Sequence, residues 1–146
     1  MERHIKEATR KVAKNNLELS LLKTIPGIGD ILGLTILYEI HDIKRFETVQ
    51  RFASYSRLVK PERTSMGKSK GGGGSKIGNQ HLTWAFSEAT VLALRNSPRA
   101  HDFLKRAERK HSKSKALSIL AHKLGRTVYF MLLKQRAFDE KKFLAA

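Results

Sequence analysis

The segment of residues 60–79 combines positive charge with glycine in a pattern suited to binding the anionic backbone of a nucleic acid. It contains five cations, one anion and six glycines, with very few apolar side chains. Because so little apolar surface could offset the entropy lost on ordering, we expect a loop here. A plain linker is the alternative, but a loop that wraps nucleic-acid phosphates explains both the glycines and the charge. Its cations are Lys60, Arg63, Lys68, Lys70 and Lys76.

Within this segment, the triplet Gly67-Lys68-Ser69 resembles the end of a nucleotide-binding P-loop. That motif places its first glycine five residues before the second one, and the residue at this position is Glu62. The motif also follows a strand, and no strand pattern precedes it here. The triplet therefore does not predict ATP binding.

The turn Ile25-Pro26-Gly27-Ile28-Gly29 has the form of a helix-hairpin-helix between two apolar segments. Gly27 and Gly29 would let backbone N–H groups approach a phosphate, and the positive end of the next helix would point at the same place. Such contacts bind the nucleic-acid backbone and carry no sequence information. Asp30 would oppose a phosphate there unless it caps the helix. A purely structural helical hairpin is the alternative.

A second group of cations occupies residues 95–115. Its eight cations face only two carboxylates, Asp102 and Glu108, and such an imbalance is self-repelling unless a polyanion neutralises it. We therefore expect DNA or RNA to bind here, with a solvated charged face as the alternative. The cations are Arg95, Arg99, Lys105, Arg106, Arg109, Lys110, Lys113 and Lys115, and the predicted nucleic-acid-binding residues among them are Lys105, Arg106, Arg109 and Lys110.

Other chemistry is not visible in the pattern. The six histidines include no pair at i,i+4 spacing, so no metal site is predicted in this chain. Trp84 and Phe86 lie within a run of core-type residues, and we interpret both as packing residues rather than platforms for stacked bases.

The elements that must position these residues are predicted to be helices only. Apolar residues recur at helical spacing throughout, and strand-type alternation is nowhere convincing. The fold class is therefore an all-α helical bundle. The expected helices cover residues 3–23, a stretch directly after the turn, and about 45–58, 79–95, 98–110 and 113–136.

The first of these helices carries a heptad pattern. Ile5, Val12 and Leu19 are spaced by seven, with Ala8, Asn15 and Leu22 at the companion positions. This is typical of a short coiled coil, although a helix packed on its own domain can look similar. We expect a coiled-coil-like helix at 1–20 and one domain at 21–146, containing the hairpin (21–40) and the glycine-rich basic loop (60–79).

Composition limits the class of protein. The chain has 146 residues, of which 40% are apolar, which suits one domain with a real core. Its net charge of +16 favours polyanionic partners, and a ribosome-like RNA binder is the bland alternative. No apolar run could span a membrane, no secretory signal is visible and no cysteine is present. A cytoplasmic protein without a membrane partner fits best.

Several short motifs occur in an order that resembles a known family. They are Leu22-Lys23-Thr24-Ile25-Pro26-Gly27-Ile28-Gly29, Arg45-Phe46, Arg57-Leu58-Val59, Ser65-Met66-Gly67-Lys68, Lys76-Ile77-Gly78-Asn79 with Leu82, and Ala121-His122-Lys123-Leu124. Together they resemble the C-terminal domain of the insertion-sequence one-ten family of transposases, nearest its eleven-eleven subgroup. The resemblance covers about residues 18–143.

The resemblance implies a specific reaction. Proteins of this family carry an N-terminal RuvC-like domain whose four acidic residues bind metal, so Mg²⁺ is expected with that domain and no cofactor with this chain. Their C-terminal domain supplies a serine that attacks a DNA phosphate and forms a covalent intermediate. The serine maps onto Ser65, with Thr64 and Ser69 as competing hydroxyls. The resemblance further implies DNA as substrate, a guide non-coding RNA and a homo-oligomer, in the nucleoid of a prokaryote.

The residues near Ser65 suit part of this chemistry. Arg63, Lys68 and Lys70 can neutralise phosphate charge, but nothing nearby supplies a base: only Glu62 is close in sequence, and it is not assigned that role. Because no RuvC-like sequence lies within this chain, we expect a fragment or a truncated copy that binds DNA or RNA without cutting it. A non-catalytic helix-hairpin-helix module, or a transposase remnant, is the alternative function.

Overall fold

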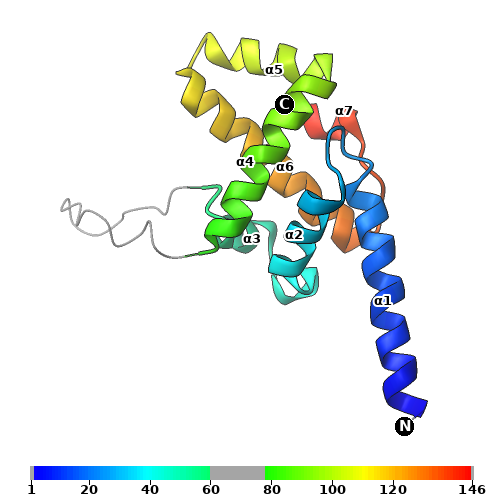
Figure 1. Cartoon of the computed structure of the whole chain (residues 1–146). Helices are drawn as coiled ribbons and strands as arrows, with labels where there is room; N and C mark the ends of the chain where they lie inside the picture. Colours follow the sequence, from blue (N-terminus) through cyan, green and yellow to red (C-terminus); the bar gives the residue numbers. More distant parts are fainter. Residues whose placement is uncertain (1, 60–77, 146) are drawn as a thin grey trace, which may run out of the picture.

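The computed structural model describes residues 2–59 and 78–145 of the chain (Figure 1). The elements are α1 (Glu2–Leu22), α2 (Asp30–Ile40), the 3₁₀ helix η1 (Ile43–Arg45), α3 (Val49–Tyr55), α4 (Gln80–Asn96), α5 (Pro98–Glu108), α6 (Lys113–Lys134) and α7 (Glu140–Leu144). The described residues include no strand. The all-α fold predicted from the apolar spacing is confirmed.

Two predicted elements differ from the structure. The single helix expected over 45–58 is instead η1 followed by α3, because Asp42 caps η1 and Thr48 starts a new helix by accepting a hydrogen bond from Arg51 N. The short helix α7 was not expected. It begins at a side-chain cap, Asp139, and its apolar anchor Phe143 is buried.

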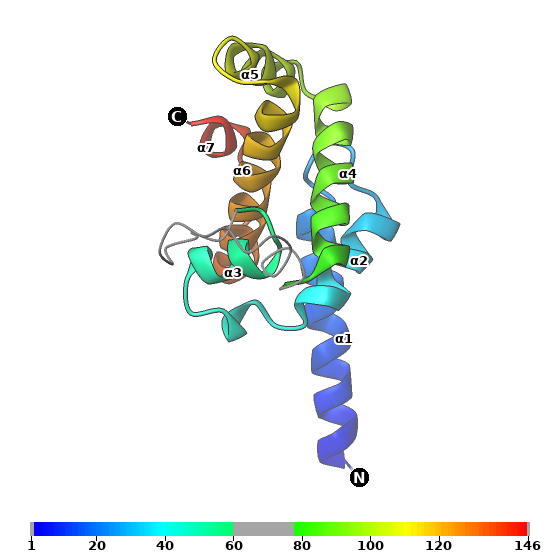
Figure 2. The same cartoon turned by 90° about the vertical axis from the view of Figure 1, so that its left-hand side faces the viewer.

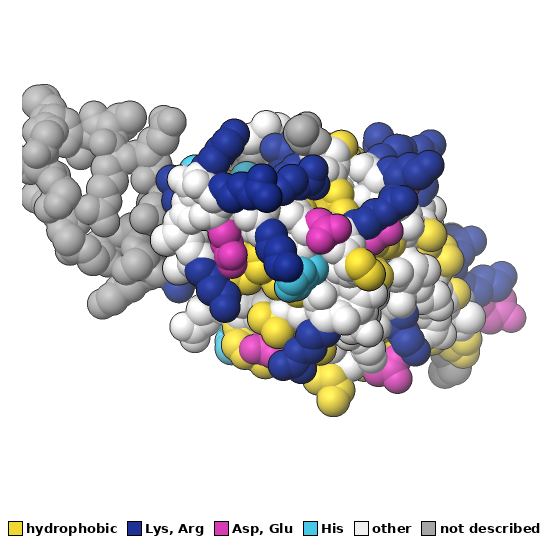
Figure 3. All heavy atoms as spheres, turned by 90° about the horizontal axis from the view of Figure 1, so that it is seen from above, with side chains coloured by type: hydrophobic (Ala, Val, Ile, Leu, Met, Phe, Trp, Pro, Cys, Tyr) yellow, Lys and Arg dark blue, Asp and Glu magenta, His cyan; other side chains and the backbone are white. Residues whose placement is uncertain are grey.

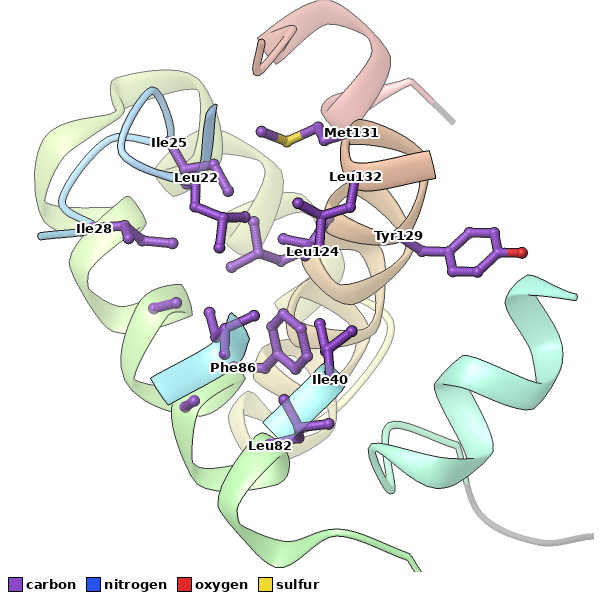
Figure 4. Packing of buried hydrophobic residues seen from close by; sticks show 14 of the residues in the cluster. Leu22, Ile25, Ile28, Ile40, Leu82, Phe86, Leu124, Tyr129, Met131 and Leu132 are labelled. Carbon is purple, nitrogen blue, oxygen red and sulfur yellow. The ribbon is translucent and has the colours of Figure 1, made fainter. Parts of the chain in front are cut away.

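The core lies where α4 and α6 run beside each other, with α2, α3 and the end of α1 packed around them (Figures 1 and 2). Phe52 of α3 is fully buried, and its ring contacts those of Phe86 in α4 and Tyr129 in α6. Figure 4 shows Leu22 and Ile25 near Leu124 at one end of this apolar interior, and Leu82 near Ile40 and Phe86 at the other. Each fully buried aliphatic or aromatic side chain contributes roughly 1.5–3 kcal/mol to folding, so this cluster fixes the relative positions of the helices.

The two aromatic residues of α4 have different environments. Phe86 is fully buried, as expected, but Trp84 is 53% exposed and the packing interpretation was wrong for it. The buried face of α4 contains Leu82, Ala85 and Phe86, and at 100° per residue Trp84 projects from the opposite side.

The heptad seam of α1 is packed only at its C-terminal end. Leu22 is fully buried, whereas Ile5 and Val12 are 61% and 59% exposed. Figures 1 and 2 both show the N-terminal part of α1 extending beyond the bundle. Packing within the chain therefore explains the last turn of the seam and leaves its first two heptads without a partner in the described structure.

Candidate nucleic-acid interface

The two glycines of the hairpin turn between α1 and α2 have different structural roles. Gly27 has φ +89°, and a Cβ added there would lie 2.7 Å from Leu92 Cβ and 2.9 Å from Leu92 O. Gly29 has φ −103°, and nothing lies within 4 Å of the place where its Cβ would be. Gly27 is therefore required by the close approach of the turn to α4, whereas Gly29 leaves the start of α2 open.

The N-terminus of α2 is available to a ligand. No side chain caps it, whereas Asn79, Ser97 and Ser112 cap α4, α5 and α6. Asp30, considered as a cap from the sequence, is instead the first residue of the helix and forms an ion pair of 2.8 Å with Lys23. Because Lys23 offsets the carboxylate charge, the free N–H groups of the first turn remain a suitable place for a phosphate.

Gly27 and Gly29 form a matched pair for testing this turn. Gly27→Ala is expected to lower the free energy of unfolding by about 2–4 kcal/mol, because the left-handed backbone and the contact with Leu92 both penalise a Cβ. Gly29→Ala should cost less than about 1 kcal/mol of stability. If the turn binds phosphate, Gly29→Ala should weaken duplex binding roughly two- to fivefold, the value of one helix-terminus contact. Denaturation and fluorescence anisotropy measure the two effects, and unchanged binding would favour the purely structural hairpin.

The cations predicted at 95–115 gather at the end of the molecule formed by α5 and the start of α6. Ala100 and Leu104 form the buried face of α5, so its basic residues project outward. Figure 3, which looks down on this end, shows many Lys and Arg side chains on the face, with Asp and Glu side chains in smaller number among them. In the described part of the chain, none of the eight cations forms an ion pair. Lys105, Arg106, Arg109 and Lys110 are all exposed.

The remaining predicted site residues, Ser65, Arg63, Lys68, Lys70 and Lys76, lie outside the described residues. The structure does define the residues on either side of them. Leu58 N donates to Ala53 O, and Asn79 N donates to Tyr55 O. Both flanking stretches are therefore held at the C-terminal end of α3.

A polar cluster holds Asn79 at this place. The Asn79 side chain caps α4, and its amide donates to Glu39 Oε2 (2.7 Å) and to Tyr55 Oη (3.2 Å). The guanidinium of Arg45 lies 4.8 Å from the Tyr55 ring centroid and donates through Nε to Ile40 O. The hydrogen bond from Asn79, followed by the interaction with Arg45, lowers the pKa of Tyr55. These motif residues thus join α2, α3 and α4 where the segment of residues 60–77 departs.

A further basic site, not predicted from the sequence, lies between α6 and the residues that follow it. Lys123, Arg126 and Lys134 line a cavity of about 830 Å³ together with Arg136 and Lys142. Arg126 and Lys134 lie 3 and 11 residues after Lys123, so all three are on one face of the helix. This spacing is the sequence pattern from which the site could have been predicted.

The described residues contain neither a metal-binding group nor a membrane-spanning helix. No three His, Asp or Glu residues are grouped so that they could hold a metal ion. None of the described helices is long and apolar enough to cross a membrane.

Comparison with known proteins gave one family and a small set of relatives. The sequence model described as "Transposase IS116/IS110/IS902 family" matches residues 19–105. The chain is 25% identical over 136 residues to the transposase for insertion sequence element IS1111A of Coxiella burnetii, covering 90% of this chain and 37% of that protein. It is 32% identical over 130 residues to the pilin gene-inverting proteins of Moraxella lacunata and Moraxella bovis, covering 86% of this chain and 40% of each.

The chain therefore spans about two fifths of the length of the curated relatives it matches. No solved structure matches it.

Proposed function

Because this chain belongs to the IS116/IS110/IS902 family of transposases, we propose that it is the nucleic-acid-handling part of a DNA transposase or recombinase. One structural observation carries the proposal. The cations at the α5 end project from the fold and, among the described residues, have no carboxylate partner. A phosphate backbone supplies the negative charge that this surface lacks. The open N-terminus of α2 offers a second contact to the same kind of backbone.

The proposed chemistry is covalent attack on DNA by Ser65. Its Oγ would form a bond to phosphorus while the bond from phosphorus to a deoxyribose oxygen breaks, and the leaving oxygen would take up a proton. Arg63, Lys68 and Lys70 would stabilise the added negative charge, and the hydroxyl proton would pass to a base from outside this segment. The polar cluster around Asn79 supports this assignment because it fixes Asn79, two residues after the end of the segment of residues 60–77.

Mg²⁺, which the resemblance implies, would reduce the negative charge at the reacting phosphate when bound to a RuvC-like domain. The described residues of this chain do not fit such a site, because they bring no suitable group of carboxylates or histidines together. We therefore assign no step of the reaction in this chain to the metal.

The test of nucleic-acid handling is the salt dependence of binding. The affinity of the chain for a duplex of about 20 base pairs should fall linearly on logarithmic axes, with a slope near −0.9 for each phosphate contacted. Fluorescence anisotropy between about 50 and 300 mM salt measures this slope. Failure to bind any nucleic acid at the lowest salt would contradict the proposed function. Equal affinity for structured RNA and DNA would be consistent with the guide RNA expected from the resemblance.

A second proposal concerns assembly, and the exposure of Ile5 and Val12 supports it. We expect the first heptads of α1 to pair with a helix of a second copy. Val12→Glu should then weaken self-association at least roughly 100-fold, because each seam would bury a carboxylate at about 1.5 kcal/mol or more. Light scattering measures the change, and Ala13→Glu is the control because it adds the same charge at an exposed position away from the seam. A monomeric wild-type chain would contradict the pairing.

A further inference from the structure

The cavity beside α6 combines features that none of the proposed contacts uses. One wall is a single face of α6, and the other is the chain from Arg136 to Ala145, which includes α7 (Figure 1). Three hydrogen bonds hold the second wall in place: Arg136 N to Met131 O, Phe138 N to Thr24 Oγ1 (2.8 Å) and Lys123 Nζ to Ala145 O (2.7 Å). The cavity is therefore built by the fold, and its volume of about 830 Å³ is in the range of small-ligand sites.

The rim of the cavity is positive and poorly neutralised. Its charged lining consists of five cations and one carboxylate, Asp139, which accepts hydrogen bonds from Lys141 N and Lys142 N at the start of α7. Burial, and then the charge of Arg126, lowers the pKa of Lys123. Burial, and then Arg126 and Lys123, also lowers the pKa of His122. Cations that repel one another at the mouth of a cavity would be stabilised by an anion. The cations are Lys123, Arg126, Lys134, Arg136 and Lys142.

The apolar part of the same cavity includes an accessible aromatic ring. Phe130 lines the cavity and is 37% exposed, although it belongs to the long core helix. Tyr129 packs against it edge-on at 5.1 Å, and Lys134 Nζ lies 5.4 Å from its centroid. The buried residues Met131 and Phe143 complete the apolar lining. The partly exposed ring thus lies directly beside the cations, one of which, Lys134, is placed over it.

An aromatic platform flanked by cations is the arrangement with which proteins hold single-stranded nucleic acids, because every base has a stacking face and every linkage a negative charge. We propose that this cavity receives an unpaired nucleotide of a nucleic-acid strand, with its base against Phe130 and its phosphates at Arg126 and Lys134. The inference rests on the proposed nucleic-acid function and assigns it a subsite for an unstacked base. Paired bases cannot enter, because they are stacked within the duplex.

The test compares probes that differ only in their bases. A fluorescent 12-nucleotide thymidine strand, the same strand without bases, and a duplex are titrated with the full chain. Wild-type protein should bind the thymidine strand about 5- to 150-fold more tightly than the baseless strand, since stacking contributes roughly 1–3 kcal/mol for each base held. Phe130→Ala should remove that difference and leave duplex affinity unchanged, and Phe130→Trp should restore it.

Each alternative result would contradict a specific part of the proposal. If Phe130→Ala binds the thymidine strand as wild type does, the cavity is not the base site, while duplex binding would still support the proposed function. If thymidine monophosphate competes as well as the strand, the site is for a free nucleotide and the strand proposal is wrong. If Phe130→Ala loses duplex and strand affinity equally, Phe130 has only a structural role. Circular dichroism of each variant shows whether the helices are retained.

Discussion

Replacing Ser65 with alanine is expected to abolish the covalent adduct between this protein and DNA. The adduct requires a bond from serine Oγ to phosphorus, and alanine has no atom that can replace this oxygen. Removing an enzyme nucleophile typically lowers the rate by about 10⁴- to 10⁶-fold, so no adduct should be detectable above background. The measurement combines the chain with a RuvC-like domain and the guide RNA of a family member, Mg²⁺ and fluorescent donor DNA, followed by a denaturing gel that retains only covalent complexes.

The neighbouring hydroxyls provide the matched controls. Ser69→Ala removes the same atom four residues away, and Thr64→Val removes a hydroxyl from the residue beside Ser65. Both variants should form the adduct at a rate within about tenfold of wild type, because a misplaced neighbour affects alignment less than loss of the nucleophile. An adduct that persists in Ser65→Ala and disappears in Ser69→Ala would transfer the role to Ser69. If wild type and all variants bind the duplex and none forms an adduct, the result would instead support a non-catalytic binding module.

The fold was predictable from the sequence because it depends on regular spacing. Apolar residues in α4 and α6 recur every three or four positions, and the burial of Leu82, Phe86 and Leu124 follows that period. The division between η1 and α3 was harder to see. Phe46, Val49 and Phe52 all face the core on both sides of the break, so the apolar pattern continues through it and only Thr48 marks the new helix.

The candidate site was predictable where charge alone defines it. The excess of cations over residues 95–115 is visible in the sequence because these residues are close together along the chain. The cavity beside α6 was not predictable, because its second wall includes α7. The chain before α7 is held by a hydrogen bond from Phe138 N to Thr24 Oγ1, between residues 114 positions apart. The different roles of Gly27 and Gly29 also depend on a distant neighbour, Leu92. Tertiary contacts of this kind leave no local pattern.

The basic end formed by α5 gives the second large expected effect. Replacing its four selected cations with alanine should lower duplex affinity on the order of 10³-fold near 0.1 M salt and reduce the salt slope by about 3–4 units if all four contact phosphates. Alanine at positions 105 and 106 keeps α5, since it has the highest helical propensity, and Arg109 and Lys110 lie just beyond the helix. The substituted residues are Lys105, Arg106, Arg109 and Lys110.

A control with equal charge separates contact from general attraction. A second variant replaces four exposed cations of α1, so both variants lose four charges from the net charge of +16. These residues are Arg3, Lys6, Arg10 and Lys11. The α1 variant should change the slope by less than about one unit, because the described structure places these cations on a helix that extends away from the bundle.

The two slopes together locate the nucleic acid on the protein. A slope that falls only in the α5 variant assigns the phosphate contacts to the end seen in Figure 3, beside the start of α6. If the salt slope falls equally in both variants, the affinity reflects long-range attraction by the net charge. Such attraction depends on the total charge of the protein and not on where the charges lie. An unchanged slope in the α5 variant would contradict the interface. The phosphate contacts would then lie elsewhere, and the hairpin, tested by Gly29→Ala, would be the next surface to examine.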